Sequence, residues 1–189
     1  MTDLASPTPP SAPTGTGYTP GSDTVDTVDA LAGLRDGHPL SAIRHARDKV
    51  ALHTQRSEEA LFDRDLPDLS LQERLFAAWY TTRLSLADDL ADAYTARLIA
   101  AGAQRITLDA IEAGTLDPAN DARLIAILSH VKLLAIKPID ARPEHLQTLH
   151  QAGITTRGIV ALSQLIAFVT YQLRVVAGLR ALRAAQEAA

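Results

Sequence analysis

Two ionisable side chains lie within apolar stretches of the sequence, where each could take part in chemistry. The first is His130, which is flanked by Leu128, Val131 and Leu134, so neighbouring side chains should cover part of its ring. A half-buried imidazole can have a pKa near neutrality and act as a general base. The alternative is a histidine whose hydrogen bonds are satisfied within a core or an interface.

The second side chain is Arg174, which lies within the apolar C-terminal stretch. Burying a guanidinium costs several kcal/mol unless a partner compensates its charge. We therefore expect Arg174 to pair with a carboxylate such as Glu73 or Asp88, or to bind an anion. The first alternative is structural and the second is functional.

Two further groups of titratable side chains are spaced for helices. Asp88 and Asp92 share one helical face, with Asp89 beside them, which suits proton handling, cation binding or a solvated acidic surface. His145 and His150 are five residues apart, so their rings point to different faces of one helix. Two histidines that bind one metal from one helix are typically spaced i and i+4, and a zinc site has three or more protein ligands. We predict neither a metal site nor a bound cofactor.

Aromatic side chains are few, and four of them could line a small apolar pocket between two long helices. Packing within the core explains the same residues equally well. The four are Trp79, Tyr80, Phe168 and Tyr171.

An all-α fold should position these side chains, because the sequence contains no run of alternating β-branched residues bounded by turns. Residues 1–22 hold five of the ten prolines and are predicted to be a flexible tail. Residues 23–189 are predicted to form a single helical domain. Its central element is a helix over residues 155–182, which is apolar on two sides.

Capping signals define the other expected helices. Ser70 and Glu73 form an S-x-x-E capping box, which should start a long helix ending at Gly102. Thr155 should cap the central helix. The remaining helices are predicted over residues 24–37, 39–55, 57–62, 108–113, 118–136 and 143–153.

Composition argues against several functional classes. The formal charge is −4 and the 18 Lys and Arg residues are dispersed, which argues against a nucleic-acid surface. Polar residues such as Gln164 and Gln172 interrupt the long apolar helix, so we expect a cytoplasmic protein outside the membrane. The chain contains no cysteine, which excludes disulfides and mechanisms based on a protein thiol.

Residues 133–179 combine a helix that ends before a proline, a Pro-Glu pair, the sequence Ala-Gly-Ile-Thr, and a long helix with Arg174 and Gly178 near its end. This order resembles the carboxymuconolactone decarboxylase and alkylhydroperoxidase D-like family. The aromatic stretch before Arg174 is similar to that of the peroxidase-related branch, although Leu173 replaces an asparagine. The resemblance covers about residues 70–182 and implies an alkylhydroperoxidase D-like helical bundle.

Peroxidase members of this family carry a glutamate, a C-x-x-C pair and a histidine. The resemblance places Glu73 on the glutamate and Tyr94 on the histidine, while Ala87 and Leu90 fall on the two cysteines. Peroxide reduction in the family depends on both thiols. The resemblance therefore implies a member that is not a thiol peroxidase.

The favoured hypothesis is a thiol-independent small-molecule enzyme or binding protein, decarboxylase-like or lyase-like if it is an enzyme. Its predicted catalytic residues are Glu73, Tyr94, His130 and Arg174. The alternative is a non-catalytic scaffold, or a companion subunit of a cysteine-bearing relative. A peroxidase that works without cysteine is a third possibility, for which no nucleophile or metal set is evident. Family resemblance also implies a homo-oligomer formed through the long helices.

Overall fold

The structure is a computed structural model that describes residues 26–35 and 37–188. Every regular element in this part of the chain is a helix, which confirms the predicted all-α class. The tail predicted for residues 1–22 lies outside the described residues. The helices are α1 (Thr27–Ala32), α2 (Pro39–His45), α3 (Asp48–Leu61), α4 (Leu71–Leu84), α5 (Asp88–Ala100), α6 (Arg105–Ala113), α7 (Ala122–Ile136), the short 3-10 helix η1 (Pro138–Asp140), α8 (Pro143–Gln151) and α9 (Thr156–Glu187).

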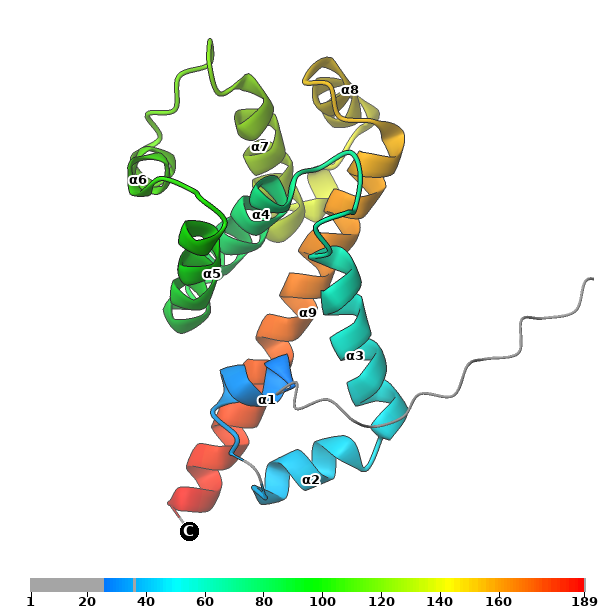
Figure 1. Ribbon diagram of the computed structural model, residues 1–189, viewed down its shortest axis with the longest axis vertical. Coiled ribbons are helices and arrows are strands. Elements are labelled where there is room, and N and C mark those ends of the chain that lie inside the picture. The colour runs from blue at the N-terminus through cyan, green and yellow to red at the C-terminus, as the bar shows by residue number, and fades with distance from the viewer. Residues whose placement is uncertain (1–25, 36, 189) are drawn as a thin grey trace, which may run out of the picture.

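The central element is α9, as the sequence predicts. It runs along the long axis of the molecule, with α4, α7 and α8 around its N-terminal half and α1 beside its C-terminal half (Figure 1). Leu162, Leu165 and Val169 are fully buried where α9 meets these neighbours. The hydroxyl of Thr155 accepts a hydrogen bond from the amide of Gly158 at 3.1 Å, which confirms the predicted cap.

The capping box at the start of α4 is also confirmed. The hydroxyl of Ser70 accepts from the amide of Glu73 at 3.2 Å, and the amide of Ser70 donates to the Glu73 carboxylate at 2.7 Å. Each side chain thus satisfies an amide that has no partner within the helix. The sequence pattern was sufficient to locate this helix start.

The long helix predicted up to Gly102 is wrong, because the chain turns sharply between α4 and α5. Leu86 adopts a left-handed conformation with a φ of 55°. The amide of Ala87 then donates to the carbonyl of Thr82 at 3.1 Å, which is the longer hydrogen bond of a Schellman helix end. Glycine usually occupies this left-handed position, so a leucine there gave no signal in the sequence.

The N-terminal helices also differ from the prediction. Helix α1 ends where Gly33 adopts a φ of 69°, four residues before the expected end at Gly37. Residues 39–55 do not form one helix, because α2 ends at His45 and α3 begins at Asp48. The short helix expected over residues 57–62 is the C-terminal part of α3.

The start of α7 also differs from the prediction. The helix begins at Ala122 rather than at Pro118. The carbonyl of Asp117 accepts hydrogen bonds from the amides of Asn120 and Asp121, at 3.1 and 2.7 Å, which closes a turn before the helix. The proline therefore belongs to this turn and not to the first turn of the helix.

A buried arginine holds the loop between α3 and α4. Arg74 is 1% exposed, and its guanidinium donates to the carbonyls of Leu61 at 2.5 Å and Asp63 at 2.6 Å. Burial lowers the pKa of this guanidinium from its usual value. The side chain satisfies the carbonyl of Leu61, the last residue of α3, and the carbonyl of Asp63 in the loop that follows.

Replacing Arg74 with methionine should therefore destabilise the fold. The variant keeps the apolar stem but leaves the carbonyls of Leu61 and Asp63 without this donor, and we expect a loss of roughly 2–4 kcal/mol in the free energy of unfolding. Urea denaturation measures the change. The matched control is Arg64→Met in the same loop, where the side chain is exposed and the expected change is small. Equal effects of the two substitutions would contradict this account of Arg74.

Candidate functional site

Tyr94 lies in a buried polar network that joins α3, α5 and α9. Its hydroxyl donates to the side-chain oxygen of Gln172 at 3.1 Å, and the Gln172 amide donates to the Glu58 carboxylate at 2.5 Å. The other Glu58 oxygen pairs with Arg97 at 2.9 Å. Burial, and secondarily the charge of Glu58, raise the pKa of Tyr94. The phenol therefore stays protonated and acts here as a hydrogen-bond donor.

Glu73 lies at the start of α4, where its carboxylate makes contacts that stabilise the fold. Besides the capping box, its carboxylate pairs with Arg123 at 2.5 Å. The Arg123 guanidinium also donates to the carbonyls of Asp68 and Ala152, at 2.7 and 3.2 Å. Glu73 thus orients an arginine that ties the loop before α4 to the loop before α9.

His130 is 6% exposed and faces α9. Its Nε2 lies 3.1 Å from the hydroxyl of Ser163, and that hydroxyl also lies 2.9 Å from the carbonyl of Ile159. The Nδ1 atom is buried without a hydrogen-bond partner among the described residues. Burial lowers the pKa of His130, and the charge of His145 lowers it further.

Arg174 is exposed on the outer side of α9, which corrects the expectation that it pairs with Glu73 or Asp88. Glu73 pairs with Arg123, and Asp88 pairs with Arg83 at 2.7 Å. Within the described part of the chain, no carboxylate forms an ion pair with Arg174. Its guanidinium lies at the rim of a hollow instead.

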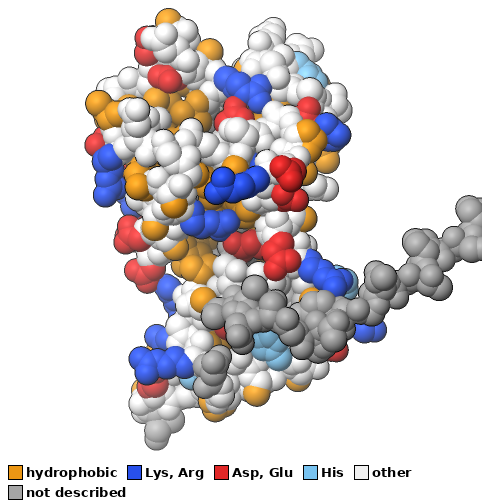
Figure 2. Space-filling model, viewed as in Figure 1, with side chains coloured by type: hydrophobic (Ala, Val, Ile, Leu, Met, Phe, Trp, Pro, Cys, Tyr) orange, Lys and Arg blue, Asp and Glu red, His pale blue; other side chains and the backbone are white. Residues whose placement is uncertain are grey.

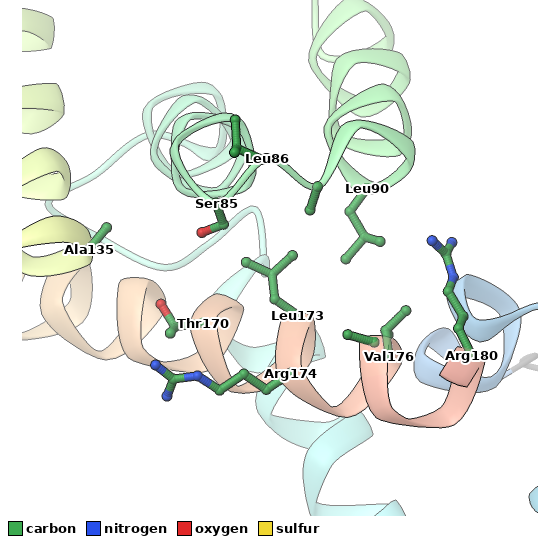
Figure 3. A pocket seen from close by; sticks show the side chains of 11 residues that line it. Ser85, Leu86, Leu90, Ala135, Thr170, Leu173, Arg174, Val176 and Arg180 are labelled. Atoms are coloured by element: carbon green, nitrogen blue, oxygen red, sulfur yellow. The ribbon is translucent and has the colours of Figure 1, made fainter. Parts of the chain in front are cut away.

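This hollow has a volume of about 450 Å³ and lies between the α4–α5 turn, the end of α7 and α9 (Figure 3). Leu90 projects into it from α5, opposite Leu173 and Val176 on α9. Arg174 lies along α9 at one end, and Arg180 stands at the other. The volume falls within the range of about 300–1,000 Å³ that is typical of small-molecule sites.

Most polar groups in the hollow already have partners. The hydroxyls of Ser85 and Thr170 each donate to a carbonyl one turn earlier in the chain, at 2.8 Å. Arg180 donates to the carbonyl of Leu31 and pairs with Asp89 at 2.8 Å. The two hydroxyls are therefore left as acceptors, and Arg174 is the charged donor that a ligand could use.

The structure does not bring the four predicted catalytic residues into one site. His130 contacts Ser163, which lies eleven residues before Arg174 on α9, or about 16 Å along the helix axis. Tyr94 is buried in the core and Glu73 lies at the start of α4. Only Arg174 lines the hollow described above.

The four aromatic residues that were predicted to line one pocket also lie in different parts of the structure. Trp79 is 3% exposed and lies in the core, with its ring 6.3 Å from that of Tyr80. Phe168 and Tyr171 line a second hollow, of about 440 Å³, between α3 and α9. A single pocket built from all four is therefore wrong, because the aromatics face different sides of the helix bundle.

The other surface side chains of the described residues do not form a candidate catalytic or metal site. Among residues 26–35 and 37–188, no three His, Asp or Glu side chains are grouped as metal ligands would be. Basic and acidic side chains are interspersed on the face shown in Figure 2. By length and composition alone, α9 is the one helix in the described chain that could cross a membrane.

No family model, curated protein or solved structure matches this chain. The functional argument therefore depends on the geometry of the hollow and its surroundings. Sequence reasoning missed Ser85 and Leu86, which form one wall, because nothing in their local pattern indicates a turn. It also missed Glu58, since a glutamate between polar neighbours resembles an ordinary surface residue.

The buried histidine should make stability depend on pH. The unfolded chain takes up a proton on His130 near pH 6.5, whereas the folded chain does so only at lower pH. Acidification below about pH 6.5 should therefore favour unfolding, and His130→Gln should remove this part of the slope. Urea denaturation between about pH 5 and pH 7.5 measures it, with the exposed His53→Gln as control. An unchanged slope in His130→Gln would refute the assignment.

Removing the buried hydroxyl tests the structural role of Tyr94. Tyr94→Phe leaves the Gln172 oxygen without its donor, so the free energy of unfolding should fall by about 1–2 kcal/mol. Thermal or urea denaturation measures the loss. Tyr80→Phe is the matched control, because that side chain is only partly buried. The interpretation fails if both variants are equally stable.

Proposed function

We propose that this protein binds a small apolar anion in the hollow between the α4–α5 turn and α9, without thiol chemistry. The observation that carries the proposal is Arg174, a guanidinium without a carboxylate partner among the described residues, at the rim of apolar walls. An apolar body would contact Leu90, Leu173 and Val176. A carboxylate or a similar anion would accept hydrogen bonds from Arg174.

Binding is favoured over catalysis because the groups that could transfer protons lie elsewhere. Tyr94 is a buried donor, Glu73 is paired with Arg123, and His130 faces Ser163 outside this hollow. General acid–base catalysis needs a group within hydrogen-bonding reach of the reacting atom. The residues that line the hollow supply charge and apolar contact, which suffice to hold a ligand.

We also propose the alkylhydroperoxidase D-like bundle as the specific fold, on the resemblance of residues 133–179. The all-helical structure is compatible with this proposal. Because the chain lacks cysteine, any activity shared with that family is independent of thiols. Fold alone does not define a reaction, so the binding proposal is tested on the hollow itself.

The test uses two fluorescent probes of similar shape, anionic anilinonaphthalene sulfonate and neutral phenylnaphthylamine. Arg174→Gln removes the charged donor but keeps the apolar walls, so the anionic probe should bind about tenfold more weakly. The neutral probe should be unaffected. Fluorescence titration gives both dissociation constants.

Two controls locate the probe. Ala177 lines the hollow on α9, so Ala177→Phe should fill the space and weaken both probes. Arg47→Gln removes an exposed arginine at the α2–α3 turn and should weaken neither. The proposal is overturned if Arg174→Gln leaves the anionic probe unchanged, or if Ala177→Phe does so.

A further inference from the structure

A further hollow lies between α4, α7 and the segment that ends α6. Its volume is about 260 Å³, and its apolar walls include Ile111 on α6, Leu116 in the following loop and Leu128 on α7. Ile111 is 8% exposed and Leu128 is 6% exposed, so packing within the core holds both in place. Helices α4 and α7, which supply the remaining walls, pack side by side (Figure 1). The hollow is therefore built on packed helices.

Three polar side chains line this hollow, and none has a hydrogen-bond or ion-pair partner among residues 26–35 and 37–188. Tyr80 comes from α4, whereas Ser129 and Lys132 come from α7. Ser129 and Lys132 are three residues apart and therefore share one face of their helix. Two hydroxyls and one ammonium group are thus free to donate hydrogen bonds to a ligand within apolar walls.

The hydroxyl of Ser129 differs from several other hydroxyls in these helices. Those of Thr81, Thr95 and Thr170 each donate to the carbonyl four residues earlier, at 2.8, 2.9 and 2.8 Å. Serine and threonine within a helix often form this bond. Ser129 lies in the middle of α7 and has no such bond within the described chain, so its hydroxyl remains available.

Lys132 brings a positive charge to the hollow without a counter-ion. It is the one charged side chain among the described residues that line this hollow, and no carboxylate of the described chain forms an ion pair with it. The first hollow differs, because its Arg180 already pairs with Asp89 at 2.8 Å. An anionic group in this further hollow would therefore meet an uncompensated cation.

We propose that this hollow binds a sulfonate or a sulfate ester that has a small apolar body. Such a group carries one negative charge, which matches the one lysine. Its three terminal oxygens match the three donor side chains, Tyr80, Ser129 and Lys132. The apolar body would contact Leu116 and Leu128. The volume is below the range of about 300–1,000 Å³ that is typical of small-molecule sites, which favours a body of one ring.

Other anions match this set of side chains less well. A carboxylate has two oxygens and would leave one of the three donor side chains without an acceptor. A phosphate monoester carries a charge of about −1.5 to −2 at pH 7, which one lysine does not compensate. The inference does not depend on the ligand proposed for the first hollow, because the two hollows share no residue.

The single tryptophan of the chain provides a local reporter for the test. The rings of Trp79 and Tyr80 are 6.3 Å apart, so a ligand that contacts Tyr80 should change the surroundings of the indole. A ¹⁵N-labelled full-length chain gives one indole N–H signal in an NMR spectrum. The ligands for titration are benzenesulfonate, neutral benzenesulfonamide, benzoate and phenyl phosphate.

We expect benzenesulfonate to move the indole signal in a saturable way, and each of the other three compounds to bind about tenfold more weakly. A failure of benzenesulfonate to move the signal would overturn the inference. Equal or tighter binding of the sulfonamide would contradict the role of charge. Equal or tighter binding of benzoate or phenyl phosphate would overturn the match to a monoanion with three oxygens.

Variants test the individual side chains. Lys132→Met keeps the aliphatic part of the side chain and removes its charge, so benzenesulfonate should bind about tenfold more weakly. Ser129→Ala should weaken binding by about fivefold. The matched control is Lys137→Met, which replaces an exposed lysine directly after α7 and outside this hollow, and should change nothing. Circular dichroism verifies that each variant keeps its helices.

Two further measurements separate this site from the first hollow. Arg174→Gln should leave the affinity for benzenesulfonate at the Trp79 reporter unchanged, and Lys132→Met should leave the binding of anilinonaphthalene sulfonate unchanged. Unaltered benzenesulfonate binding in Lys132→Met would overturn the present inference alone. Unaltered anilinonaphthalene sulfonate binding in Arg174→Gln would overturn only the function proposed for the first hollow.

Discussion

A carboxylate buried beneath the central helix sets the arrangement of this protein. Glu58 accepts a hydrogen bond from Gln172 on α9 and pairs with Arg97 on α5, while Tyr94 completes the chain of contacts. An unpaired carboxylate in such a place would be costly, so the three helices must keep the positions that satisfy it. Apolar packing holds the helices together, and this network fixes their relative rotation and translation.

The same constraint explains which side of α9 remains available. Gln172 points inward to Glu58, so Arg174, two residues further along the helix, is turned outward. Helix geometry then exposes the positions one and two turns away in both directions. The position of Arg174 at the rim of the hollow is thus a consequence of one inward amide.

Local signals in the sequence were sufficient for some elements and insufficient for others. The caps at Ser70 and Thr155 depend on neighbouring residues alone, and both were predicted. The turn at Leu86 depends on α5 packing back against α4, which no local pattern encodes. Arg174 was expected inside because its neighbours are apolar, but the apolar residues of α9 surround the helix and do not indicate which side is covered. Contacts between distant helices decide that question.

The left-handed residue at the α4–α5 turn also affects how the hollow can move. A glycine in that place would let the corner open and close at little cost, whereas a leucine held at a φ of 55° has few other conformations that preserve the Schellman contacts. The α4–α5 turn is therefore expected to be rigid. A ligand would find the wall already in place, so little ordering entropy would oppose binding, and its size would be selected by a fixed shape.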